Sequence, residues 1–184
     1  RLKGASSKHL TIQLMEHQEE AVSYLSELRS TGKDTAMIIL PTGTGKTEIA
    51  LSDFHSFKVQ NPKSSGLFIV PTRNLLRQSL ERMAIRIPQY QCGKDDFDKL
   101  PDSGFMVQTA AFMNRNYERF QPDQFNYIVV DEAHHAMAPG YLRFLRHFKP
   151  DFLIGMTATP ERLDKRKLEE VFGAYDTTLS LREA

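Results

Sequence analysis

Short apolar runs alternate along this chain with longer stretches in which apolar residues recur at helical spacing. The runs are bounded by turn residues and have the length of strands that are buried on both faces. Four or five such strands are predicted, at about residues 35–40, 66–70, 104–109, 125–130 and 151–156.

Helical periodicity fills the segments between these strands. A helix is expected at Glu16–Arg29, where one face carries Ala21, Val22, Leu25 and Leu28. Further apolar stripes are Ala50, Phe54 and Phe57, then Leu76, Leu80, Met83 and Ile87, and finally Tyr141, Leu145 and Phe148 in a helix at Tyr141–Lys149. This alternation predicts an α/β fold of three layers, in which helices cover both faces of a parallel sheet.

The segment PTGTGKT, residues 41–47, lies where the first strand gives way to a helix. Gly43 and Gly45 allow this loop to curl so that backbone N–H groups point at phosphate oxygens, and the helix N-terminus adds further donors. Lys46 supplies a full charge for the β and γ phosphates, and the Thr47 hydroxyl can ligate Mg²⁺. A nucleoside triphosphate site is therefore favoured over a plain turn with a solvated lysine.

Two acidic residues, Asp131 and Glu132, follow the strand at 125–130. An aspartate at the carboxyl end of a buried strand faces the crevice where α/β sheets bind ligands. We expect Asp131 to hold Mg²⁺ through water, and Glu132 to orient and deprotonate the attacking water, because hydrolysis of this kind depends on positioning and charge neutralisation. A solvated acidic turn is the alternative, which the preceding apolar strand disfavours.

Two histidines follow the acidic pair. His134 and His135 are adjacent, so their side chains point in different directions, and no second pair at ligand spacing follows; a zinc site is not favoured. His134 is interpreted as a hydrogen-bonding link between the nucleotide and the segment around Thr157, and His135 as an ordinary polar neighbour.

The motifs PTGTGKT, DEAHH at 131–135 and MTATP at 156–160, in this order, resemble the first motor domain of superfamily 2 helicases and translocases. DEAHH with MTATPERLD is similar to the branch that includes the helicase subunits of type I and type III restriction enzymes and related DNA-repair translocases. The resemblance runs from about Leu10 to Leu181. It implies a RecA-like P-loop domain that uses ATP and Mg²⁺ and couples hydrolysis to movement on nucleic acid.

The resemblance also assigns roles residue by residue. The nucleotide contacts are Gln18, for adenine, and Thr42, Gly43, Thr44, Gly45, Lys46 and Thr47 in the phosphate loop. The contacts to the nucleic-acid backbone are Thr72, Arg73 and Thr109, and the residues that couple hydrolysis to movement are His134, Thr157 and Thr159. Two departures from the family pattern are Leu40, where phosphate loops have a glycine, and Leu14-Met15-Glu16, where the family often has Leu-Arg-Pro.

The region after the second strand supports the assignment of Thr72 independently. Thr72 is expected near a helix N-terminus, where hydroxyl and backbone donors suit a phosphate. Arg73 lies beside it, off the apolar stripe, and phosphate contact is favoured for both. For Arg82 and Arg86, further along the helix, a solvated basic face is an equal alternative.

Composition limits the possible partners. With 24 Lys and Arg against 23 Asp and Glu the net charge is +1, so nucleic-acid binding has to come from local patches. The single cysteine, Cys92, cannot form an internal disulfide, which fits a reducing cytoplasm. No apolar run approaches the length of a membrane span, so no membrane partner is expected. The polar segment 90–103 is expected to be a mobile loop.

The length of 184 residues suits one domain, residues 1–184, with an ample core. Because the chain starts at Arg1 rather than Met, we expect a piece of a longer protein. The resemblance implies a second RecA-like domain in the same parent chain, DNA as the partner (RNA being possible), and restriction or repair subunits. The main hypothesis is therefore the ATP-binding lobe of an ATP-dependent DNA helicase or translocase.

Three alternatives to this hypothesis are considered. The first is a nucleotide-gated module that binds nucleic acid without turnover, and intact Lys46, Asp131 and Glu132 disfavour it for the parent protein. The second is an RNA-directed helicase lobe, disfavoured only by analogy with the motif variants. The third is an unrelated P-loop enzyme such as a small-molecule kinase, which the TATP motif after DEAHH disfavours.

Overall fold

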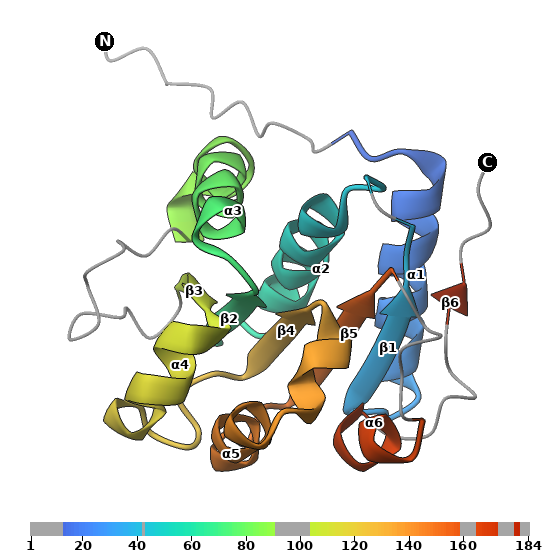
Figure 1. Cartoon of the computed structure of the whole chain (residues 1–184). Coiled ribbons are helices and arrows are strands. Elements are labelled where there is room, and N and C mark those ends of the chain that lie inside the picture. Colours follow the sequence, from blue (N-terminus) through green and yellow to red (C-terminus); the bar gives the residue numbers. More distant parts are fainter. Residues whose placement is uncertain (1–12, 42, 91–103, 159–164, 173–178, 181–184) are drawn as a thin grey trace, which may run out of the picture.

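The computed structural model describes residues 13–41, 43–90, 104–158, 165–172 and 179–180. Within them, a six-stranded sheet forms the centre of the molecule, and all neighbouring strands are parallel. The order across the sheet is β3-β2-β4-β5-β1-β6 (Figure 1). The strands are β1 Thr35–Ile39, β2 Gly66–Val70, β3 Phe105–Thr109, β4 Tyr127–Asp131, β5 Phe152–Thr157 and β6 Leu179–Ser180.

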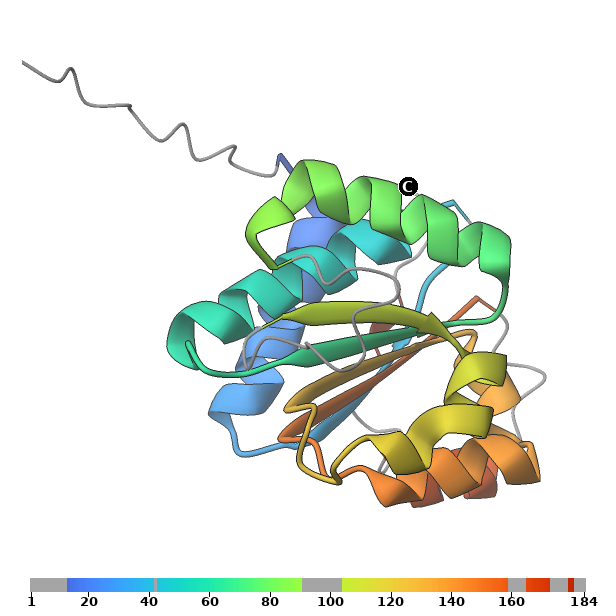
Figure 2. The same ribbon diagram turned by 90° about the vertical axis from the view of Figure 1, so that its left-hand side faces the viewer.

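Helices cover both faces of the sheet, which gives the three layers seen in Figure 2. One face is covered by α1 Glu16–Ser30, α2 Lys46–Gln60 and α3 Arg73–Arg86. The other face is covered by α4 Ala110–Asn116, α5 Pro139–His147 and α6 Lys165–Phe172. Short 3₁₀ turns are η1 Pro88–Tyr90, η3 Tyr117–Arg119 and η4 Ala133–Met137.

The alternation of side chains along each strand divides the core into two parts. In β4, Tyr127 and Val129 join the core beneath α1, α2 and α3, whereas Ile128 and Val130 join the core beneath α4, α5 and α6. Both sets are apolar, as a parallel sheet with two covered faces requires. Asp131 is the last residue of the same strand and lies on the same face as Tyr127, the face that α2 covers.

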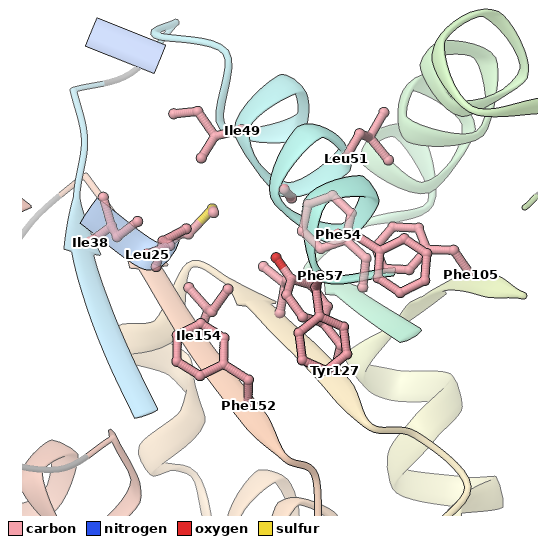
Figure 3. Packing of buried hydrophobic residues seen from close by; sticks show 14 of the residues in the cluster. Leu25, Ile38, Ile49, Leu51, Phe54, Phe57, Phe105, Tyr127, Phe152 and Ile154 are labelled. Carbon is pink, nitrogen blue, oxygen red and sulfur yellow. The ribbon is translucent and has the colours of Figure 1, made fainter. Parts of the chain in front are cut away.

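Aromatic side chains fill the core on the α2 face (Figure 3). The ring of Phe54, from α2, stacks on Phe105 of β3 with centroids 4.3 Å apart and packs against Tyr127 at 5.3 Å. Each such side chain contributes about 1.5–3 kcal/mol when it is fully buried. This packing fixes α2, and with it the loop that precedes α2, over the sheet.

The predicted parallel α/β fold is confirmed, and the five expected strands lie within two residues of their expected bounds. β6 was not expected, because a two-residue strand leaves no periodicity to detect. α4 was missed for the same reason of length, with seven residues. The helix expected at Tyr141–Lys149 starts at Pro139 and ends at His147, and Phe144 is also buried.

Several expectations fall on residues beyond the described ranges. Of the expected loop at 90–103, only Tyr90 is described, as the last residue of η1. Cys92, Thr42 and Thr159 lie outside the described residues. Among the residues that are described, no helix combines the length and the apolar content needed to cross a bilayer.

Candidate active site

The loop between β1 and α2 has the backbone geometry of an anion-binding site. Gly43 and Gly45 have φ values of +84° and +80°, a conformation that glycine adopts without steric cost. A Cβ at Gly45 would also lie 2.3 Å from Nε2 of Gln18, so a side chain at this position would have to displace the Gln18 amide. No side chain caps the N-terminus of α2, which leaves N–H groups of its first turn for a ligand.

The start of α1 holds this loop from one side. Gln18 donates from Nε2 to the carbonyl oxygen of Thr44 at 3.0 Å, and its Oε1 accepts the N–H of Met15 at 3.0 Å. His17 Nε2 lies 2.9 Å from the same Thr44 oxygen and donates to it, because a carbonyl only accepts. In this structure, therefore, the amide expected to contact adenine contacts the phosphate loop. The His17 contact had no signal in the sequence.

Lys46 lies between two carboxylates. Its Nζ is 3.0 Å from Oε1 of Glu132 and 3.3 Å from Oδ1 of Asp131, although these acids are far away in the sequence. The contact crosses from the first turn of α2 to the carboxyl end of β4, two strands away from β1 in the sheet. The fold thus brings together the lysine and both acidic residues that the sequence singled out.

Burial changes the acidity of Asp131. Burial raises the pKa of Asp131, Lys46 opposes that rise, and the charge of Glu132 adds to it. The Glu132 backbone N–H donates to Asp131 Oδ1 at 2.9 Å. Burial, with the charge of Asp131 adding to it, also raises the pKa of the Tyr141 hydroxyl on α5. A cation beside Asp131 therefore stabilises the ionised form of this buried carboxylate.

Glu132 adopts a backbone conformation that is rare for a residue with a side chain. Its φ of 51° and ψ of 53° lie in the left-handed region, which costs about 1–3 kcal/mol and is concentrated at functional sites. In this conformation one carboxylate oxygen contacts Lys46, and the other, Oε2, lies 3.3 Å from Nδ1 of His134.

His134 connects Glu132 to the end of β5. Its Nδ1 lies 3.1 Å from the hydroxyl oxygen of Thr157, a fully buried residue, as well as 3.3 Å from Glu132. A continuous set of contacts therefore runs from Lys46 through Glu132 and His134 to Thr157. His135, by contrast, is exposed.

The donor set fits a magnesium ion that is held partly by phosphate. Mg²⁺ is usually bound by one or two carboxylates together with waters and substrate phosphates. Asp131 supplies a carboxylate, and Thr47, the second residue of α2, supplies a hydroxyl. Lys46 also contributes a positive charge, which lies between the Asp131 and Glu132 carboxylates. In the described part of the chain, no group of three His, Cys, Asp or Glu residues forms a metal site by itself.

The expected nucleic-acid contacts lie at the same edge of the sheet but outside this cluster. Thr72 caps α3, where its hydroxyl accepts the Leu75 N–H at 3.3 Å, and Thr109 caps α4 in the same way, from Phe112 at 3.2 Å. The structure therefore gives both threonines a structural role as helix caps. Arg73 is exposed in the first turn of α3.

A glycine-built phosphate loop, a lysine and paired acidic residues at the carboxyl edge of a parallel sheet define a RecA-like P-loop domain. Residues 11–162 match the family described as "Type III restriction enzyme, res subunit", and the chain belongs to this family. It is a first motor domain of the superfamily 2 helicase class.

Individual relatives agree with this assignment. The chain is 34% identical over 183 residues to "DNA 3'-5' translocase XPB2" of Sulfurisphaera tokodaii, covering 89% of the chain and 38% of that protein. It is 30% identical over 173 residues to "Putative ATP-dependent helicase IRC3" of Saccharomyces cerevisiae, covering 86% and 25%. It therefore spans well under half the length of these relatives.

A solved structure shows the same fold. The chain is similar to the "SWI2/SNF2 ATPase core in complex with dsDNA" of Sulfolobus solfataricus, with a TM-score of 0.75 and 22% identity, covering 92% of this chain and 38% of that one. At this identity the likeness concerns the fold.

Proposed function

We propose that this chain is the ATP-binding lobe of an ATP-dependent DNA helicase or translocase. The observation that carries the proposal is the position of Lys46 between Asp131 and Glu132, beside a loop whose glycines have positive φ. A lysine that neutralises two acids beside such a loop is placed to exchange them for phosphate oxygens. Membership of the res-subunit family supports the same function.

Nucleotide binding is assigned to the phosphate loop and the start of α2. The N–H groups around Gly43 and Gly45 and in the first turn of α2 suit phosphate oxygens, and Lys46 adds a full charge. Gln18 and His17 hold the Thr44 carbonyl and so keep the loop in shape. Recognition of adenine by Gln18 requires its amide to exchange one of the present contacts.

Metal binding is assigned to Thr47 and Asp131. Bound Mg²⁺ would neutralise phosphate charge during hydrolysis. Glu132 is assigned the role of general base, because its carboxylate lies beside Asp131 at the same edge of the sheet. His134 would hold that carboxylate in place and, through Thr157, connect it to the segment that contains Thr159.

DNA is the proposed nucleic acid along which the protein moves. Its backbone would be contacted by Thr72, Arg73 and Thr109. Support comes from the similarity to XPB2, a DNA 3'-5' translocase, and from membership of the res-subunit family. A second RecA-like domain of the same protein and restriction or repair subunits complete the proposal. A cytoplasmic location belongs to it as well, supported by a single cysteine, Cys92, which cannot form an internal disulfide.

The test measures nucleotide affinity and ATP hydrolysis of the full-length protein, with and without duplex DNA, and compares both with the Lys46→Ala variant. We expect hydrolysis that DNA stimulates in the wild type. The variant should lose nucleotide affinity, because a hydrogen bond to a charged group contributes about 1.5–3 kcal/mol. Unchanged affinity in Lys46→Ala would remove the assignment of the loop, and hydrolysis indifferent to DNA would remove the assignment of a translocase.

A further inference from the structure

Glu48, in the first turn of α2, has a carboxylate that solvent does not reach. Both of its oxygens are buried and lack an aligned hydrogen-bond donor among the described residues. Two arginines of α3 balance the charge instead. Arg86 Nε lies 3.1 Å from Oε2, and Arg82 Nη1 lies 3.4 Å from Oε1. Arg82 and Arg86 therefore form ion pairs with α2, the helix that follows the phosphate loop. They are not simply part of a basic face that solvent surrounds.

This contact depends on the distance between the two helices. A buried carboxylate is tolerated only while its counter-charges stay in place, because an unpaired buried charge is strongly unfavourable. The Arg86 side chain is 28% exposed and that of Arg82 is 58% exposed, against 13% for Glu48. A small displacement of α3 along α2 would therefore leave Glu48 unbalanced, while the arginines could turn to solvent.

Glu48 is also close to the phosphate loop. It follows Lys46 by two residues in the same helical turn, and its Cγ lies 3.8 Å from the position that a Cβ on Gly45 would occupy. Helix α3 contacts Glu48 near its C-terminal end, through Arg86. Its N-terminal end begins at Arg73 and is capped by Thr72, where nucleic acid is proposed to bind. A helix of this length measures about 20 Å, so α3 links two sites that are too far apart for direct contact.

We propose that Glu48 is a positioning residue that transmits the binding of nucleic acid on α3 to the phosphate loop. A shift of α3 changes how Arg82 and Arg86 hold the Glu48 carboxylate. That change moves the first turn of α2, which carries Lys46. The inference rests on the proposed function, because it requires that DNA and nucleotide bind at the two ends of this path.

The test measures the affinity of the full-length protein for a fluorescent ADP with Mg²⁺, with and without a short DNA duplex. The ratio of the two dissociation constants is the coupling factor, and for allosteric proteins it is typically about 5–150-fold. Wild type is compared with Glu48→Gln, Arg86→Ala and the double variant. Glu81→Gln is the control, because Glu81 is an exposed acid on α3, the helix that also carries Arg86.

We expect a coupling factor that falls to near one in Glu48→Gln and Arg86→Ala, with the affinity in the absence of DNA nearly unchanged. The double variant should be no worse than either single variant, since both remove the same contact. Glu81→Gln should keep the wild-type factor.

Three results would overturn the inference. The first is a wild-type coupling factor in both Glu48→Gln and Arg86→Ala. The second is an equal loss of affinity with and without DNA, which would indicate a merely structural role. The third is a wild-type protein that shows no coupling. In that case DNA-stimulated ATP hydrolysis, measured separately, decides the proposed function by itself.

Discussion

The Gln18 amide donates to the backbone carbonyl of Thr44 at 3.0 Å, so α1 contacts the phosphate loop through an atom that every residue possesses. The other amide atom, Oε1, accepts the N–H of Met15. Both ends of the side chain are therefore engaged within the protein. This arrangement makes Gln18 a residue that shapes the loop.

Replacing Gln18 with Ala should weaken the binding of ATP and GTP by a similar factor. A lost neutral hydrogen bond costs about 0.5–1.5 kcal/mol, which corresponds to about 2- to 10-fold in affinity. Calorimetric titration of the variant and the wild type with both nucleotides measures the two factors. A loss confined to ATP would instead place the amide on adenine in the bound state.

A buried charge network should contribute strongly to stability. Asp53, fully buried in α2, accepts two hydrogen bonds from Arg29 at 2.7 Å each and one from the Tyr127 hydroxyl at 2.7 Å. Burial raises the pKa of Tyr127, with the charge of Asp53 adding to it, so the phenol stays protonated and donates. The network connects α1, α2 and β4.

We expect Tyr127→Phe to lower the free energy of unfolding by about 1.5–3 kcal/mol, the usual contribution of a hydrogen bond to a charged group. Asp53→Ala should cost about 3–5 kcal/mol, because it strands the Arg29 charge. Urea unfolding measures both. Tyr117→Phe is the matched control, since its hydroxyl bonds Glu118 at the surface, and it should change stability by less than about 0.5 kcal/mol. Equal effects at Tyr127 and Tyr117 would contradict this account.

The raised pKa of Asp131 predicts a pH dependence of stability. A carboxyl whose pKa is higher in the folded state favours folding below its unfolded pKa, and this contribution is lost as the pH rises through the folded pKa. The metal-free wild type should therefore lose stability relative to Asp131→Asn across that window. Urea unfolding at a series of acidic to neutral pH values gives the difference. If the wild type instead became more stable than Asp131→Asn as the pH rises, the effect of Lys46 on the pKa of Asp131 would outweigh that of burial.

The sequence predicted the sheet and the central cluster because both depend on local signals. Each apolar run has the period and length of a buried strand. Asp131 ends such a strand, and Lys46 begins the helix that follows another one. Parallel strands bring such ends together at one edge, so the meeting of these residues follows from the fold.

Contacts between distant side chains could not be predicted in this way. Arg29 and Asp53 each look like ordinary polar positions on a helix, and only the angle between α1 and α2 makes them meet. Glu48 and Arg86 are another such pair, joined by the packing of α2 on α3. The hydrogen bonds of His17 and Gln18 end on a backbone carbonyl, which carries no residue-specific signal.

The isolated chain should hydrolyse ATP poorly. Phosphoryl-transfer enzymes of this kind gain about 10³–10⁵ in rate from an arginine supplied across an interface. The described ion pairs of Asp131 and Glu132 involve Lys46 and His134, and no arginine. Steady-state hydrolysis by the isolated chain and by the full-length protein, each with and without DNA, measures the difference. Robust, DNA-stimulated turnover by the isolated chain would overturn the need for a second lobe.

The most direct test of the site is Glu132→Gln in the full-length protein. This change keeps the shape of the side chain but removes the carboxylate that lies between Lys46 and His134. Binding of ATP with Mg²⁺ should persist, while the turnover rate should fall by about 10²–10⁴-fold, the usual contribution of a general base. Calorimetry and single-turnover hydrolysis on the same preparation give both quantities. Wild-type turnover in this variant would contradict the assignment of Glu132 and require another base.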